Sequence, residues 1–183
     1  SPYDPLAQDL YNRLQPPSLG HPFGTDDFGR DILSRVIYGS RISLRIGLVA
    51  VVIALALGTS IGLVAGYWGG LLDLVLMRLM DLLLAFPSIL LAIGIVAILG
   101  PGLENAMLAI GLVAVPQYAR LVRASALSVR EMDYVQASRA LGAGHARILL
   151  VAILPNCLAP LIVQATLGLA TAILDAAGLS FLG

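Results

Sequence analysis

The chain contains no lysine, and all eleven of its basic residues are arginine. Because a Walker A phosphate-binding loop needs a lysine, the sequence excludes a P-loop ATP site in this chain. The only histidines are His21 and His145, which excludes the HExxH pattern and most zinc-binding patterns. The single cysteine, Cys157, excludes an internal disulfide framework and is interpreted as a packing residue. We therefore expect no catalytic residue, no metal and no cofactor.

Charge is scarce as well. Only 12% of the residues are charged and the formal net charge is zero, so the sequence does not favour nucleic-acid binding. Hydrophobic residues make up 58% of the chain, and the mean hydropathy is +0.91. A soluble domain this apolar would expose large apolar patches. The composition therefore predicts a membrane protein with the lipid bilayer as its surroundings.

Four apolar runs are long enough to cross a bilayer, since a crossing helix needs ~20 apolar residues. They lie at about 46–72, 71–99, 104–128 and 148–174. Pro87 predicts a bend or a new helix within the second run, and Pro116 predicts a kink in the third. The sequence thus predicts an all-α, polytopic helix bundle with about four spanning helices.

Two helix faces repeat a small residue every four positions, and we expect both to pack closely against other helices. The residues are Gly58, Gly62 and Gly66 in the first run, and Gly168, Ala172 and Ala176 in the last. Tyr67 and Trp68 follow the first glycine face, a position typical of aromatic residues at the level of the lipid headgroups.

The first 41 residues differ from the rest. Residues 1–20 are rich in proline, which predicts an extended leader. Thr25 or Asp26 is expected to cap a helix that begins near Asp27. Apolar residues then recur at helical spacing among arginines: Ile32, Leu33, Val36 and Ile37. This pattern is typical of an amphipathic helix at a membrane interface, which we expect to complete a first region over 1–41.

A polar stretch, 133–156, lies between two apolar runs. Small residues near its start, among them Ala137, Ser138 and Ala140, favour a helix that another surface can approach closely. Glycine at 142 and 144 predicts a break in that helix. Leu154-Pro155 predicts a new helix start, since proline suits a first helical turn. We therefore expect a short helix, a bend, a second short helix and then the last span.

This stretch resembles the EAA loop in the membrane subunits of bacterial ABC importers. That pattern is Glu-Ala-Ala, three residues, Gly, nine residues, Ile, one residue, Leu-Pro. The chain matches this pattern with Gln136-Ala137-Ser138, Gly142 and Leu154-Pro155. It departs from the pattern at two positions: Gln136 replaces the Glu, and Ala152 occupies the Ile position, with Ile153 beside it. The segments Gly24-Thr25-Asp26, Gly29-Arg30-Asp31 and 39–44 look like the dipeptide, oligopeptide and nickel branch of these importers.

The resemblance implies the transmembrane domain of a type I ABC importer, with ATP hydrolysis on partner subunits. The implied partners are a second, related permease subunit in a heterodimer, two ATP-binding subunits and an extracytoplasmic substrate-binding protein. Region 42–183 would be a partial transmembrane domain with a cytoplasmic coupling loop at about 131–153. Since the branch has about six core helices, we expect a longer subunit with one more helix at each end. The residues implied in coupling to the ATPase are Gln136, Ala137, Ser138, Ala140, Gly142, Gly144, Arg147, Leu154 and Pro155.

Charge alone does not orient the chain. Each side of the predicted bundle holds five arginines: Arg13, Arg30, Arg35, Arg41 and Arg45 on one, and Arg120, Arg123, Arg130, Arg139 and Arg147 on the other. The positive-inside rule therefore gives a tie. The resemblance implies a cytoplasmic coupling loop, an extracytoplasmic region 1–41, and a multi-pass protein of the bacterial cytoplasmic (inner) membrane.

Three charges fall within or beside the apolar runs: Arg78, Asp81 and Asp175. Arg78 and Asp81 share a helix face, which favours a structural ion pair between them. The alternative is that these charges act in a gate or contact a ligand. Asp175 fits a capping or interface role, or a place on the transport pathway. The three also allow a different function, an ion-coupled secondary carrier or channel. The substrate stays open between peptides and a related small solute.

Overall fold

The computed structural model describes residues 1–182, so Gly183, the last residue of the predicted transmembrane region, lies outside the described residues. The chain divides into two compact units, Ser1–Arg45 and Ile46–Gly183. The described residues form helices, turns and one isolated β-bridge between Thr25 and Asp31. The elements are η1 (Leu10–Asn12), α1 (Ile32–Trp68), α2 (Gly70–Leu84), α3 (Ser88–Leu99), α4 (Leu103–Arg130), α5 (Asp133–Ala140), α6 (His145–Arg147), η2 (Ile148–Ile153) and α7 (Leu154–Leu182).

Side-chain hydrogen bonds hold the mostly irregular first unit together. The predicted helix start near Asp27 is wrong, because α1 begins at Ile32. Asp31 is the cap: its carboxylate accepts a hydrogen bond from the Ser34 backbone N–H at 2.8 Å. The Thr25 hydroxyl accepts instead from the Gln15 backbone N–H at 2.9 Å and donates to the Asn12 carbonyl. Thr25 therefore joins two loop segments rather than capping a helix.

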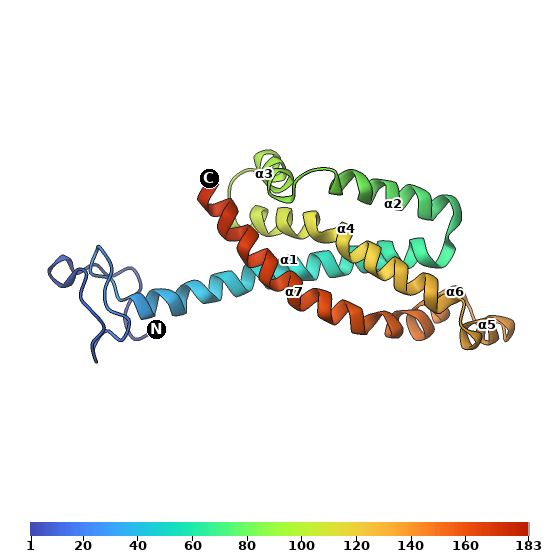
Figure 1. The fold of residues 1–183 in the computed structure, drawn as a ribbon, viewed down its shortest axis with the longest axis horizontal. Helices are drawn as coiled ribbons and strands as arrows, with labels where there is room; N and C mark the ends of the chain where they lie inside the picture. The colour runs from blue at the N-terminus through green and yellow to red at the C-terminus, as the bar shows by residue number, and fades with distance from the viewer. Residues whose placement is uncertain (183) are drawn as a thin grey trace. The chain divides into compact units, whose positions relative to one another are not determined.

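Helix α1 is continuous over 37 residues, from Ile32 to Trp68 (Figure 1). The predicted separation into an interfacial helix and a first span is therefore wrong. Nothing in the intervening sequence, Gly-Ser-Arg-Ile-Ser-Leu-Arg over 39–45, forces a break, because it contains no proline and its lone glycine is tolerated in a helix.

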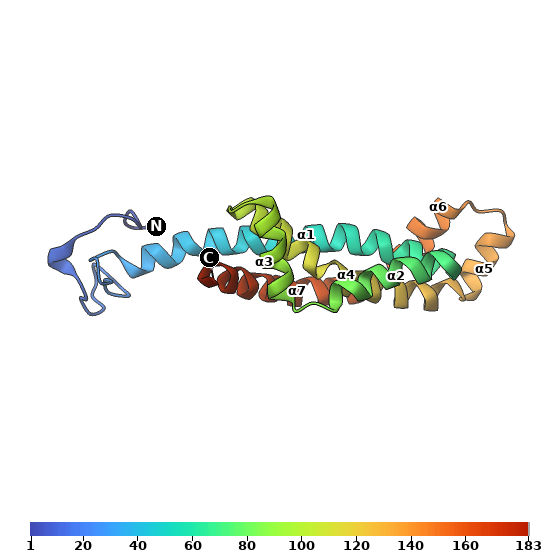
Figure 2. The same cartoon turned by 90° about the horizontal axis from the view of Figure 1, so that it is seen from above.

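In the second unit, α4 and α7 pack against one another, residues 46–68 of α1 contact both, and α2 lies alongside α4 (Figures 1 and 2). Glycine allows the closest approaches. A Cβ atom at Gly62 would lie 2.5 Å from the Ala119 carbonyl oxygen, and one at Gly168 would lie 2.2 Å from the Tyr118 hydroxyl oxygen. Both predicted small-residue faces thus contact α4, because only a missing side chain permits these short distances to the Ala119 backbone and the Tyr118 side chain.

In the described part of the chain, three helices are long and apolar enough to cross a membrane: Ile32–Trp68, Leu103–Arg130 and His145–Phe181. A fourth crossing is possible by length and composition if α2 and α3 count as one broken span, bent by 94°. Pro87 lies at the bend, in the position just before α3, as the sequence predicts. The prediction of an all-α membrane bundle is confirmed. Helix α4 continues through Pro116.

Candidate functional site

The polar stretch after α4 forms a helix, a turn and a helical return at one end of the bundle (Figures 1 and 2). Helix α5 ends at Ala140, and the chain turns at Gly142, whose φ of 82° lies in the left-handed region that favours glycine. The turn is closed by hydrogen bonds from the Gly142 N–H to the Arg139 carbonyl and from the Ala143 N–H to the Ser138 carbonyl, at 3.0 and 3.1 Å. We call residues 133–147 the end loop.

The two glycines of the end loop have different roles. Gly144 precedes α6 with φ −66° and ψ 156°, an extended conformation that any residue adopts. A Cβ atom would meet nothing within 4 Å at either glycine. Only Gly142 therefore requires glycine for its backbone, and the expectation that both break the helix through special geometry is wrong for Gly144.

Leu154-Pro155 does not begin a separate helix. The chain runs on from α6 through η2, a π-helical segment, into α7. The Leu154 N–H bonds to the Leu149 carbonyl, five residues back, as in a π-helix. Pro155 has no N–H and cannot bond to the carbonyl four residues back, so the turn before it widens. The Asn156 side chain donates to the Ala152 carbonyl at 2.7 Å, next to this widened turn.

The base of the end loop is anchored in the core. Val135, Ile148 and Ile153 are buried, and they belong to one apolar cluster with residues of α4 and α7. The opposite face is open: Gln136, Ala137, Ala140, Gly142, Gly144 and Arg147 are exposed, and Ser138 is half-buried. The predicted coupling residues of this loop are thus exposed, apart from the half-buried Ser138, whereas Leu154 and Pro155 lie at the start of α7.

A contact that sequence reasoning missed joins the end loop to α1. The Tyr67 hydroxyl lies 2.8 Å from Nδ1 of His145, and the Arg139 guanidinium lies 5.7 Å from the Tyr67 ring centroid. Tyr67 is buried, so the sequence-based interpretation of this residue as a headgroup anchor does not describe its contacts. The two partners are 78 residues apart, and no sequence signal connects them.

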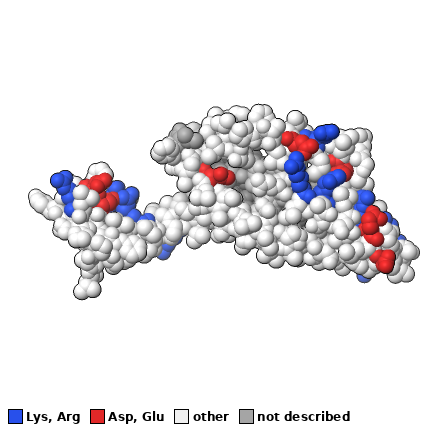
Figure 3. Space-filling model, in the orientation of Figure 1, with Lys and Arg blue, Asp and Glu red and all other residues white. Residues whose placement is uncertain are grey.

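Ion pairs join α2 to α4 near the same end of the bundle, where Figure 3 shows charged side chains gathered. Both Arg123 nitrogens Nε and Nη2 bond to the Asp73 carboxylate. Arg120 Nη2 bonds to Asp81 at 2.5 Å, whereas Arg78 lies 3.8 Å from Asp81 and is mostly exposed. The main partner of Asp81 is therefore Arg120 rather than Arg78. Sequence reasoning missed Asp73 as a pairing residue.

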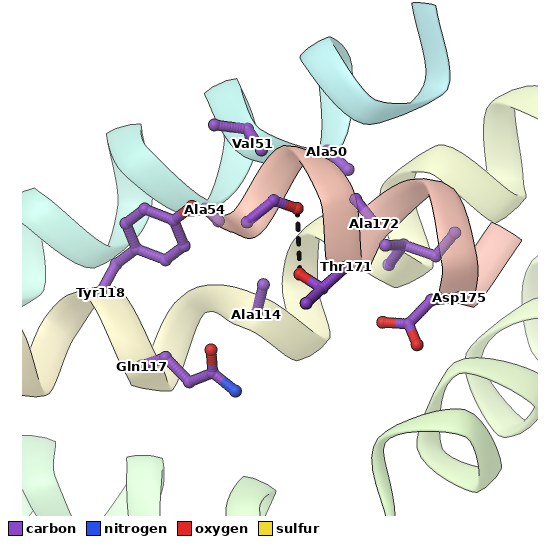
Figure 4. Close-up of a pocket in the computed structure, with 11 residues that line it drawn as sticks. Ala50, Val51, Ala54, Ala114, Gln117, Tyr118, Thr171, Ala172 and Asp175 are labelled. Atoms are coloured by element: carbon purple, nitrogen blue, oxygen red, sulfur yellow. Dashed lines mark hydrogen bonds between the residues drawn. The ribbon is translucent and has the colours of Figure 1, made fainter. Parts of the chain in front are cut away.

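Asp175 lies elsewhere, half-buried in a pocket between α1, α4 and α7 (Figure 4). Its polar neighbours in that pocket are Gln117, Tyr118 and Thr171. The structure therefore does not bring Asp175 together with Arg78 and Asp81. Within residues 1–182, no group of three or more His, Cys, Asp or Glu residues is placed to hold a metal ion.

Comparisons with known proteins agree on one family. Residues 58–183 match the family described as the binding-protein-dependent transport system inner membrane component. The dipeptide transport system permease protein of Alkalihalophilus pseudofirmus is 58% identical over 172 residues, which is 94% of this chain and 57% of that protein. Its Haemophilus influenzae counterpart is 51% identical over 189 residues, covering 100% of this chain and 64% of that protein. The chain spans about three fifths of the length of these relatives.

A solved structure supports the fold. The crystal structure of an amino acid ABC transporter with histidines superimposes with a TM-score of 0.59 at 20% sequence identity, over 84% of this chain and 77% of that chain. At this identity the likeness concerns the helical fold alone.

Proposed function

The chain belongs to the family of inner membrane components of binding-protein-dependent transport systems, and from this premise we propose that it is a permease subunit of an ATP-driven importer. The complete subunit would form half of the translocation pathway. A second, related permease would form the other half, two ATP-binding subunits would dock on the cytoplasmic side, and an extracytoplasmic binding protein would deliver the substrate.

The proposal rests on the exposure of the end loop. It presents a set of small and polar side chains outward, while Val135 and Ile148 hold its base in the core. A protruding element with a rigid base suits the transmission of motion from a docked partner. We propose that the ATP-binding subunits grip this exposed face, and that their closure on ATP moves the end loop as one body.

Two connections would carry that motion into the bundle. The buried residues at the base link the loop to α4 and α7 through the shared apolar cluster. The hydrogen bond between His145 and Tyr67 links it to α1. Because packed helices switch between arrangements rather than deform continuously, a shift at the loop would rock these helices and change the side on which the pathway opens.

Peptides are the proposed substrate class. The relatives above are named dipeptide transport permeases, and a probable D,D-dipeptide transport permease of Escherichia coli is 50% identical over 99% of this chain. The rival function, an ion-coupled carrier or channel that relies on Arg78, Asp81 and Asp175, gains no support. Asp81 is already paired with Arg120, and Asp175 lines a separate pocket.

Cross-linking tests the docking proposal. Ala137→Cys places a thiol on the exposed face of α5, and Ile98→Cys places one on α3, where the native side chain is 86% exposed. The native Cys157 is buried, so background labelling is low. In membranes with the complete importer, a short bifunctional reagent should join Ala137→Cys, but not Ile98→Cys, to an ATP-binding subunit. Equal yields from the two positions, or none from Ala137→Cys, would reject the proposal.

A further inference from the structure

The pocket around Asp175 holds a carboxylate for which the described residues, 1–182, supply no cation. The ion pairs within residues 1–182 use other carboxylates. Of the pocket-lining residues in the described chain, Asp175 alone is charged. It lies in α7, which is long and apolar enough to span. A lone charge in such a helix costs at least ~2.5–3.5 kcal/mol in lipid, so it is expected to face water or a ligand rather than acyl chains.

The two hydroxyl groups of the pocket are already engaged as hydrogen-bond donors. The Thr171 hydroxyl donates to the Gly168 carbonyl at 3.0 Å, and the Tyr118 hydroxyl donates to the Gln164 carbonyl at 3.2 Å. Their oxygen lone pairs therefore stay available to a donor. The Gln117 amide adds a carbonyl oxygen, which accepts a hydrogen bond from the Gln164 side-chain amide at 3.5 Å and keeps a second lone pair. Figure 4 shows Gln117 and Asp175 projecting to the same side of the pocket.

A carboxylate with neutral oxygen acceptors around it matches a primary ammonium group, which has three N–H donors and one positive charge. We propose that Asp175, with Gln117 and Thr171, binds the amino-terminal ammonium of a peptide as it crosses the membrane. This inference rests on the proposed function, since it concerns the same pathway, and it assigns one chemical group of the substrate to one place in the bundle. The wall formed by Ala50, Val51, Ala54 and Ile110 beside this group is apolar.

The first test measures binding without the binding protein, whose own selectivity would otherwise dominate. The complete membrane complex in detergent is heated with millimolar alanyl-alanine or its N-acetyl form. The free-amine peptide should raise the midpoint of unfolding of the wild type, and the N-acetyl peptide should not. Asp175→Asn should respond to neither. Equal shifts by both peptides, or no shift in the wild type, would overturn the proposal.

The second test measures transport in proteoliposomes with peptide-loaded binding protein. Asp175→Asn should lower peptide uptake per ATP hydrolysed by about tenfold or more, the size expected for one lost charge-assisted contact. Asp175→Glu, which keeps the carboxylate, should restore most of it. Glu104→Gln is the matched control, because it removes one negative charge from an exposed position in the first turn of α4 and should behave as wild type.

The outcomes separate the two proposals. If the wild-type importer takes up no peptide, the proposed function fails. If the wild type transports and Asp175→Asn transports equally well, only the ammonium site fails. If Asp175→Asn loses the second permease or the ATPase stimulation by loaded binding protein, Asp175 acts in assembly, and the ammonium site is likewise overturned.

Discussion

Asp26 shows how single residues organise the first unit. Its carboxylate accepts hydrogen bonds from the backbone N–H groups of Phe28 and Arg30, and from the Arg30 and Arg35 side chains. Burial raises the pKa of Asp26, but these four donors outweigh it and lower the pKa from 3.8 to about 2. The carboxylate, rather than a regular element, fixes the loop that precedes α1.

A pH dependence follows from that lowered pKa. Because the folded pKa lies below the unfolded value, Asp26 contributes its full stabilisation above about pH 4 and loses it as the pH falls toward 2. Hydrogen–deuterium exchange in residues 1–45, corrected for the intrinsic pH dependence of exchange, should therefore accelerate between pH 4 and pH 2. Asp26→Asn should exchange fast already at pH 5. A variant that is as well protected as wild type at pH 5 would contradict this role.

The single-residue roles were the hardest to derive from sequence. Asp26 was expected to start a helix, yet the helix begins five residues later, because Asp31 is the residue placed to accept the Ser34 N–H. A cap position depends on where the chain enters the helix, and here the entry is fixed by the bridge between Thr25 and Asp31. Several nearby acidic and hydroxyl residues match the preference for an N-cap, so this preference alone does not predict which of them caps α1.

At the level of helices, the glycine face of α1 sets how closely α4 can pack. A Cβ atom at Gly62 would lie 2.5 Å from the Ala119 carbonyl oxygen and 2.7 Å from the Val122 Cβ atom. Gly62→Ala should push the helices apart and lower the free energy of unfolding by about 1–3 kcal/mol, the usual cost of overpacking. Gly94→Ala is the control, since a Cβ there meets nothing within 4 Å. Unfolding midpoints in detergent that fall equally for both variants would refute the packing argument.

The ion pair between α2 and α4 gives a second prediction. Asp73 and Arg123 are mostly shielded, with side chains 15% and 34% exposed, and they share two hydrogen bonds. A double-mutant cycle with Asp73→Asn and Arg123→Gln should give a coupling energy of about 1–3 kcal/mol in unfolding experiments. The same cycle on Arg78 and Asp81, which lie 3.8 Å apart and more exposed, should give less than about 0.5 kcal/mol. The reverse order would contradict the assignment of partners.

The helices themselves were largely predictable, because long apolar runs and glycine–proline turns are local signals. Pro87 separates α2 from α3, and Gly142 separates α5 from α6. The continuity of α1 was not predictable, since the arginines in its first half indicate a change of surroundings but not a break in the backbone. The partners of Asp73, Asp81 and Tyr67 are fixed by how helices distant in sequence pack, which no periodicity within one helix reveals.

At the scale of the whole molecule, we propose that motion of the end loop drives the rearrangement of the helix bundle. The loop is open on one face, held at its base by Val135 and Ile148, and linked to α1 by His145 and Tyr67. This arrangement requires that the turn at Gly142 keep α5 and α6 in a fixed relation. If the turn is distorted while the bundle stays intact, the proposed importer should still hydrolyse ATP but should lose transport.

The measurement that tests this claim most directly is the ratio of peptide uptake to ATP hydrolysis in proteoliposomes carrying the complete importer. Gly142→Val forces a β-branched residue into a φ of 82°, whereas Gly94→Val places the same side chain in α3, outside the end loop, where a Cβ atom meets nothing within 4 Å. Both variants should insert and assemble as wild type does. We expect a ratio at least about tenfold lower for Gly142→Val and an unchanged ratio for Gly94→Val; a wild-type ratio for Gly142→Val would contradict the proposed coupling.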